Sequence, residues 1–117
     1  MKSLIELLNE VKNKDEKFED FSEKRQSGAE KIANNAKEKG GLSMLTYNHF
    51  IVKMPYYEKA KKGNFDPEKG KKEYKDLLDK LVKASEDVNM TQTEFQRLVG
   101  KIEVVGELII KSKEAQK

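Results

Sequence analysis

Apolar residues recur at every third or fourth position along most of the chain, which is the spacing of helices that each bury one side. This spacing, with the residues that start and stop helices, predicts four principal helices near residues 3 to 39, 43 to 62, 67 to 87 and 92 to 113. Connections of about three to six residues favour antiparallel neighbours. We therefore expect an all-α fold, an antiparallel helical bundle of about four helices in a single domain spanning residues 1 to 117.

Three of the predicted helix starts carry residues that can cap a helix. Asp66 supplies a side-chain oxygen immediately before Pro67, which suits the first helical position. Thr91 is followed three residues later by Glu94, the pattern of a capping box. Ser43 is the candidate cap of the second helix.

The same chain contains signals that interrupt or end helices. Gly40 and Gly41 predict the end of the first helix, because glycine adopts the left-handed conformation that closes a helical turn. The polar residues from Asn13 to Asp15 leave open whether the first helix is long or broken, with Asp15 as the cap of a second piece. Pro55 predicts a kink in the second helix, since it lacks an N–H group and clashes with the preceding turn.

The interior of the bundle can also be outlined from the pattern. The apolar stripe of the third helix comprises Tyr74, Leu77, Leu78, Leu81 and Val82. Core positions are expected at Leu77, Leu81, Leu98, Ile102 and Val105. Glycines at positions 28, 100 and 106 lie inside helical patterns, where each costs about 1 kcal/mol relative to alanine. We expect at least one of them to mark a close approach of two helices.

The composition excludes several classes of chemistry. The chain has no cysteine, which rules out disulfides, thiolate zinc sites, iron–sulfur ligation and cysteine nucleophiles. Its single histidine, His49, cannot supply a metal site that needs two or three histidines from one chain. A glutamate followed three residues later by histidine, the motif of di-metal carboxylate bundles, does not occur. We expect neither a metal site nor a cofactor.

The distribution of apolar residues also bears on localisation. Uninterrupted apolar runs are only a few residues long, too short to span a bilayer, and no secretory segment follows Met1. Charged residues make up 38% of the chain, against roughly 25% in a typical soluble domain. We therefore expect a soluble, cytoplasmic protein that contacts no membrane.

An enzymatic function would rest on His49, the only ordinary general base near neutral pH. No acidic residue lies one helical turn away to orient it, although a partner from another helix could do so. The segment GNFDPEKGKK (63 to 72) departs from a phosphate-binding loop in its glycine spacing and in the residue after the lysine. We assign no catalytic residue, and a small enzyme relying on His49 is the third hypothesis.

Large side chains concentrate around Pro55, where one helix can turn only about a 100° stripe inward. Some of these side chains should therefore be exposed, and exposed aromatic patches usually mark a contact surface. The leading hypothesis is a non-enzymatic helical interaction module that binds a protein partner, or a second copy of itself, through residues 47 to 62. The predicted partner-binding residues are Tyr47, His49, Phe50, Lys53, Tyr56 and Tyr57. Replacing both Tyr56 and Tyr57 by alanine is expected to leave the melting temperature nearly unchanged.

Lysines border these aromatic residues, so the same region could grip phosphates and stack unpaired bases. The alternative hypothesis is therefore a nucleic-acid-binding protein. Its predicted binding residues are Lys53, Lys59, Lys61, Lys62, Lys69, Lys71 and Lys72. Acidic residues interspersed among these lysines dilute the local positive charge, which ranks this hypothesis second.

Three stretches of the sequence carry a resemblance. They are GAEKIANNAKEKGG (Gly28 to Gly41), LTYNHFIVKMPYYEKA (Leu45 to Ala60) and MTQTEFQRLVGKIEVVGELI (Met90 to Ile109). These stretches resemble small uncharacterised proteins encoded by T4-like tailed phages of marine cyanobacteria. The resemblance covers under half of the chain and implies a phage protein in the host cytoplasm, without implying an activity, a ligand or a catalytic residue.

Overall fold

The computed structural model describes residues 17 to 115, and the break considered at Asn13 to Asp15 lies outside the described residues. Its helices are α2 (Phe18–Lys39), α3 (Ser43–Ile51), α4 (Met54–Lys61), α5 (Pro67–Ala84) and α6 (Gln92–Ala115). The described residues contain no strand. The predicted all-α fold is confirmed, with α3 and α4 as the two parts of the kinked second helix.

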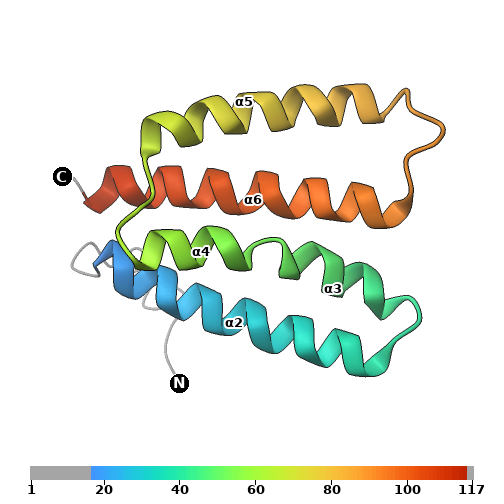
Figure 1. Cartoon of the computed structure of the whole chain (residues 1–117), viewed down its shortest axis with the longest axis horizontal. Coiled ribbons are helices and arrows are strands. Elements are labelled where there is room, and N and C mark those ends of the chain that lie inside the picture. Colours follow the sequence, from blue (N-terminus) through green and yellow to red (C-terminus); the bar gives the residue numbers. More distant parts are fainter. Residues whose placement is uncertain (1–16, 116–117) are drawn as a thin grey trace, which may run out of the picture.

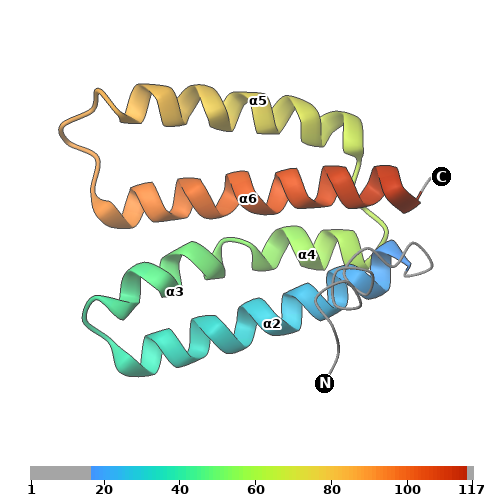
Figure 2. The same ribbon diagram turned by 180° about the vertical axis from the view of Figure 1, so that it is seen from behind.

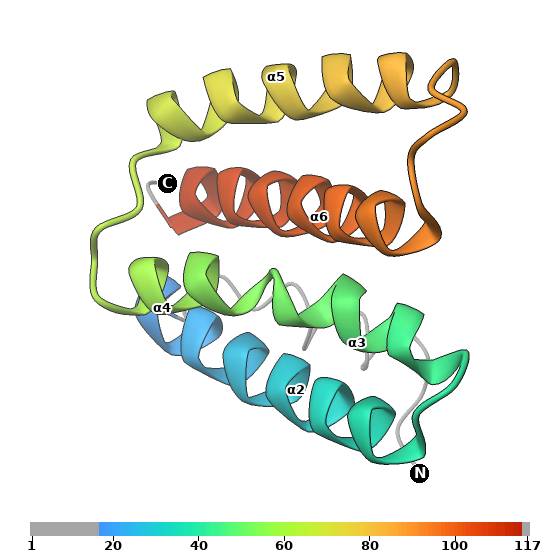
Figure 3. The same cartoon turned by 45° about the vertical axis from the view of Figure 1, so that its right-hand side comes forward.

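The described helices form two antiparallel hairpins, α2 with α3 and α4, and α5 with α6 (Figure 1). They lie side by side in the order α5, α6, α3 with α4, and α2, and Figure 2 shows the same order from behind. The two hairpins meet mainly where α6 packs against α3. Helix α5 lies at the outer edge and packs against α6, and no other described helix contacts it to a comparable extent (Figure 3).

The predicted starts of α5 and α6 are confirmed. The Asp66 side chain accepts a hydrogen bond from the Glu68 N–H at 3.0 Å, and Pro67 occupies the first helical position. Thr91 and Glu94 form the reciprocal bonds of a capping box, at 3.1 and 3.2 Å. The expected cap at Ser43 is wrong: Ser43 is already helical, Leu42 holds the N-cap position, and no side chain caps α3.

The predicted interruptions also occur. Helix α2 ends at Lys39, and Gly40 follows with a φ of 65°, its N–H donating to the Ala36 carbonyl at 3.1 Å. Helix α3 ends at Ile51 and α4 begins at Met54. Pro55 has no N–H to donate to the Ile51 carbonyl and its ring would crowd that group, so a continuous helix cannot form here.

The core lies between α6 and its neighbours on either side. The predicted core residues Leu77, Leu98 and Val105 are buried, and Leu81 and Ile102 are partly buried against the same cluster. Other members of the core are Phe21, Ala29, Tyr57, Ala60, Val104, Leu108 and Ile109. Within the described residues, no helix is both long enough and apolar enough to cross a membrane.

Two residues of the predicted stripe of α5 do not enter this core. Leu78 is 37% exposed and Val82 is 67% exposed. A stripe that includes both of them with Leu77 and Leu81 is wider than the contact with a single neighbouring helix. Because α5 packs closely only on α6 among the described helices, one edge of its stripe stays at the surface.

The expectation of a close helix approach at glycine is confirmed at Gly100, where α6 passes directly against the backbone of α3. Gly106 allows a similar close approach between α6 and α5, because a Cβ atom there would lie 3.2 Å from the ring of Tyr74. At Gly28 no neighbouring helix of the described part of the chain comes within 4 Å of an added Cβ atom. The three glycines therefore differ in whether a side chain can be added.

Candidate interaction surface

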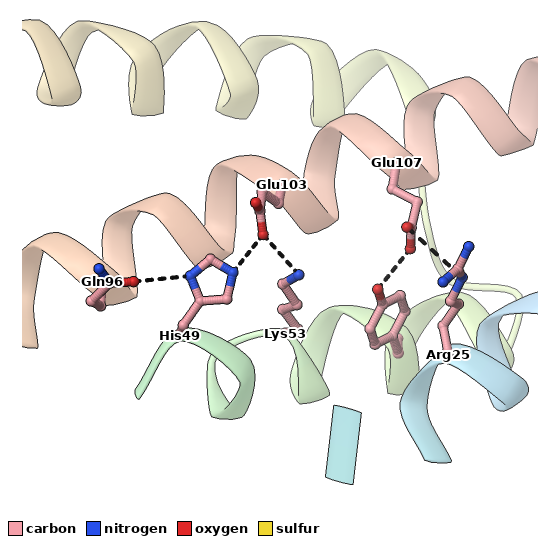
Figure 4. A network of polar contacts seen from close by, with 7 residues as sticks. Arg25, His49, Lys53, Gln96, Glu103 and Glu107 are labelled. Atoms are coloured by element: carbon pink, nitrogen blue, oxygen red, sulfur yellow. Dashed lines mark hydrogen bonds and ion pairs between the residues drawn. The ribbon is translucent and has the colours of Figure 1, made fainter. Parts of the chain in front are cut away.

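His49 lies in a polar network that joins α3 to α6 (Figure 4). Its Nε2 atom is 2.5 Å from Oε2 of Glu103, and its Nδ1 atom is 3.2 Å from Oε1 of Gln96. The ammonium group of Lys53 lies 2.9 Å from the same Glu103 oxygen. The side chains of His49 and Lys53 are mostly buried, whereas that of Glu103 is half exposed. The network therefore holds the two hairpins together.

The charge of Glu103 is stabilised by this arrangement. Partial burial of Glu103 acts to raise its pKa, but the hydrogen bonds and positive charge of Lys53 and His49 outweigh burial and hold the pKa below its usual value. Both ring nitrogens of His49 already contact polar groups of α6. This geometry is that of a structural histidine whose orientation is fixed by its partners.

Tyr57 is a core residue, which corrects its expected place on an exposed surface. Its side chain is 3% exposed, and its hydroxyl donates a hydrogen bond to Oε1 of Glu107 at 2.6 Å. Burial, followed by this hydrogen bond, raises the pKa of Tyr57. Nε of Arg25 in α2 lies 3.8 Å from the other Glu107 oxygen. The contacts of Glu107 with Tyr57 and Arg25 therefore join α6 to α4 and α2 (Figure 4). Tyr57 cannot be offered to a partner without opening the core.

The remaining aromatic residues of the predicted contact segment are partly buried. Phe50 and Tyr56 pack against the core. The Tyr56 hydroxyl donates to Glu73 at 2.5 Å, and partial burial and this bond raise the pKa of Tyr56. The Lys37 ammonium group lies over the Tyr47 ring, 5.9 Å from the ring centroid. The aromatic side chains of the predicted contact segment are therefore engaged mainly in contacts within the bundle.

A cleft of about 400 Å³ lies where α4 meets the start of α5. Its lining residues are Pro55, Tyr56, Lys59, Asn64, Phe65, Asp66, Lys69, Gly70 and Glu73. Two lysines face two carboxylates, and both carboxylates already accept hydrogen bonds, from Tyr56 and from the Glu68 N–H. The lining therefore favours neither an anionic nor a cationic ligand.

The lysines predicted to bind nucleic acid are divided among different environments. Four of them form ion pairs: Lys53 with Glu103, Lys61 and Lys62 with Glu58, and Lys71 with Glu68. In the described part of the chain, no ion pair involves Lys59, Lys69 or Lys72. Among the described residues, three of these lysines thus have no acidic partner, and the seven do not act as one patch of free charge.

Three large apolar side chains follow one line along α5. Tyr74, Leu78 and Val82 are spaced four residues apart, which places them on one side of the helix. Tyr74 is partly buried, and exposure increases through Leu78 to Val82. This side of α5 borders the groove that α5 forms with α6, because Tyr74 lies against Gly106.

Helix α6 extends the same apolar surface. Phe95 precedes Gly106 by eleven residues, about three helical turns, so the two positions lie on one side of α6. Ile110 follows one turn later, and the exposed fractions of Phe95 and Ile110 are 39% and 62%. We call the set Tyr74, Leu78, Val82, Phe95 and Ile110 the outer strip. No described helix covers it.

One end of the outer strip is hollowed into a groove of about 320 Å³. Its lining residues are Lys71, Tyr74, Gly106, Ile109, Ile110 and Lys113. The absence of a side chain at Gly106 leaves room beside the Tyr74 ring. The groove is mostly apolar with a lysine from each helix at its edge, which suits a large apolar side chain of a protein partner.

Among the residues described, no group of three or more His, Asp or Glu side chains is arranged to hold a metal ion. His49 also lines neither the cleft beside α4 nor the groove of the outer strip.

Comparisons with family models, curated proteins and solved structures found no match to this chain. The resemblance to phage-encoded proteins stays a prediction.

Sequence reasoning did not find Glu103, Gln96 and Glu107 as partners of His49 and Tyr57, because those contacts join residues about fifty positions apart. It also placed the exposed edge of α5 in the core. A usable signal was present: Leu77, Leu78, Leu81 and Val82 give α5 a stripe wider than one packing partner requires.

Proposed function

We propose that this chain is a non-enzymatic helical interaction module that binds a protein partner through the outer strip. The observation that carries this proposal is the exposure of Val82 and Ile110 along a hairpin edge that no described helix covers. Apolar surface gains about 25 cal/mol for each Å² removed from water. A partner that covers these side chains and fills the adjoining groove gains this free energy without unfolding the bundle.

The outer strip supports binding better than the segment around Pro55. The aromatic residues of that segment are buried or half buried, and Tyr57 is part of the core. Binding through Tyr57 would require the loss of its hydrogen bond to Glu107. Leu78, Val82 and Ile110 need no such rearrangement, because their side chains already face solvent.

The non-enzymatic part of the proposal is supported by the surroundings of His49. A general base needs a ring nitrogen that can reach a substrate proton. Here one nitrogen contacts Glu103 and the other contacts Gln96, so accepting a substrate proton would disrupt the tether between α3 and α6.

Site-specific photo-crosslinking tests the proposed surface. A photoreactive benzoylphenylalanine would be placed singly at position 82 or 110 in the outer strip, or at position 47 in the rival segment. Position 72 serves as the control, because Lys72 is exposed on a different side of α5. We expect the same adduct from positions 82 and 110 in a lysate of the native host, and none from position 72.

The adduct's protein would then be purified and its affinity measured directly. Val82→Glu should weaken binding at least about tenfold, because the new carboxylate would be desolvated against an apolar surface. Adducts from position 47 alone would instead assign binding to the segment around Pro55. No adduct above the level of position 72 would contradict the proposed function.

A further inference from the structure

We infer that one occupant of the outer strip is a second copy of this chain, paired through α5 in an antiparallel, two-fold symmetric dimer. This inference rests on the proposed function, because it uses the same surface and names the partner. It is carried by the order of charged and apolar residues along the exposed side of α5.

That order changes from basic to apolar to acidic. Lys71, Lys75, Leu78, Val82 and Glu86 follow one another at intervals of three or four residues, so they lie along one side of the helix. Helix α5 ends at Ala84, but backbone hydrogen bonds from Glu86 to Lys83 and from Asp87 to Ala84 continue its turns. All five side chains are exposed.

The charge difference extends over the whole element. Residues 67 to 75 contain four lysines and two glutamates, whereas residues 76 to 87 contain two lysines and four acidic residues. A parallel pair of α5 helices would place like charges together. An antiparallel pair brings the basic start of each α5 toward the acidic residues that follow α5 in the other copy, which is electrostatically complementary.

A two-fold axis midway between Leu78 and Val82 pairs the apolar residues of the two copies with each other and brings their charged residues near opposite charges. Leu78 of each copy then faces Val82 of the other, and both lose their exposure to water. Lys75 and Lys71 face positions 85 and 89 of the other copy, which bracket Glu86 and Asp87. Such an interface is isologous, so every contact occurs twice and the assembly closes at two chains.

The size of this contact sets the expected affinity. With the axis between Leu78 and Val82, the two α5 helices overlap only from residue 76 to residue 84 of each copy, a length of about 13 Å. One helix pair of this length is at the small end of specific interfaces, so we expect a dimer with a dissociation constant in roughly the micromolar to high-micromolar range.

Sedimentation equilibrium of the full chain tests the inference. The wild-type chain should show a monomer–dimer equilibrium. Val82→Glu should weaken dimerisation at least about tenfold, as should the double charge reversal Lys71→Glu with Lys75→Glu and the single reversal Glu86→Lys. All of these positions are exposed, so circular dichroism should remain that of the wild-type fold.

Two combinations test the ion pairs of the dimer. Placing the three charge reversals in one chain should restore dimerisation to within about threefold of wild type, because both sides of every ion pair are exchanged, and this recovery is specific to the antiparallel pairing. Mixing the lysine double variant with the Glu86→Lys variant should produce a heterodimer, since one chain is acidic and the other basic at both ends of the line from Lys71 to Glu86. The control Lys72→Glu with Lys83→Glu changes net charge as much as the lysine double variant does. Each of its positions lies about 100° round the helix from the line that runs from Lys71 to Glu86, so it should leave dimerisation nearly unchanged.

Each adverse result has a defined meaning. A wild-type chain that stays monomeric at several hundred micromolar, a variant with all three charge reversals that does not recover, or a control as weak as the charge-reversal variants would overturn the dimer. If the chain is monomeric while position 82 still crosslinks to another protein, only the self-association fails. If it is monomeric and no adduct forms, the proposed function fails as well.

Discussion

Gly100 of α6 lies directly against the backbone of His49 in α3: a Cβ atom at position 100 would stand 2.1 Å from the His49 carbonyl oxygen. The Val52 side chain is also close, at 2.8 Å from the same point. This approach is where the two helical hairpins meet. It also brings Glu103, one turn further along α6, within reach of His49 and Lys53.

Gly100→Ala should therefore be strongly destabilising, although alanine is the better helix former. The methyl group would overlap a backbone oxygen, so α3 and α6 must move apart, at a cost of at least about 2 kcal/mol. Gly28→Ala is the matched control, because within residues 17 to 115 no atom beyond its own helix lies within 4 Å of an added Cβ atom. It should instead stabilise by up to about 1 kcal/mol. Equal effects in urea denaturation would show that the close approach is not real.

Tyr57→Phe tests the burial of a tyrosine that sequence reasoning placed on the surface. Phenylalanine fills the same space but leaves the Glu107 carboxylate without its donor, so the free energy of unfolding should fall by about 1 to 3 kcal/mol. Tyr47→Phe is the control, since no described residue hydrogen-bonds the Tyr47 hydroxyl. A Tyr57→Phe variant as stable as Tyr47→Phe would contradict the burial of Tyr57 and its hydrogen bond to Glu107.

The contact between α2 and α4 should give the chain a stability contribution that depends on acid pH. Gln26 donates to Glu58 at 2.6 Å, and this bond, followed by those from Lys61 and Lys62, lowers the pKa of Glu58 from 4.5 to about 2. The folded state favours the carboxylate, so the contribution is complete above pH 4.5 and is lost as pH falls toward 2. A carboxyl NMR titration should show this low midpoint, and Gln26→Ala should raise it. A wild-type midpoint near 4.5 would contradict the contact.

Nucleic-acid binding can be judged from its salt dependence as well as from its strength. Each phosphate contact on duplex DNA contributes about −0.9 to the slope of log K against log salt concentration. The three lysines without ion pairs predict at most a weak complex with a slope near about −2.7, whereas seven engaged lysines would give about −6.3. Electrophoretic shifts or fluorescence anisotropy over a salt series distinguish these cases. A slope of about −6.3 would support the nucleic-acid hypothesis.

The helix ends were predictable because their signals are local. Asp66, Thr91 and Gly40 each act on backbone groups within a few residues, and each forms the bond that its sequence context implies. Pro55 interrupts its helix for an equally local reason.

The candidate site was less predictable because it depends on which helices become neighbours. His49 finds its acidic partner 54 residues away in α6, and Tyr57 finds its partner 50 residues away. Leu78 and Val82 have the same apolar character as Leu77, and only the position of α5 at the edge of the bundle leaves them exposed. Periodicity identifies an apolar side of a helix, but the neighbouring helices decide how much of that side is covered.

Amide chemical shifts measured by two-dimensional NMR, in dilute and in concentrated solutions of the full chain, test the outer strip most directly. A dimer paired through α5 should give concentration-dependent changes that centre on Leu78 and Val82 and extend to Tyr74, Phe95 and Ile110. Residues 47 to 57 should remain unchanged, because their side chains are engaged inside the bundle. Changes confined to residues 47 to 57 would move the contact away from the outer strip, and spectra that do not change at any concentration would overturn the dimer.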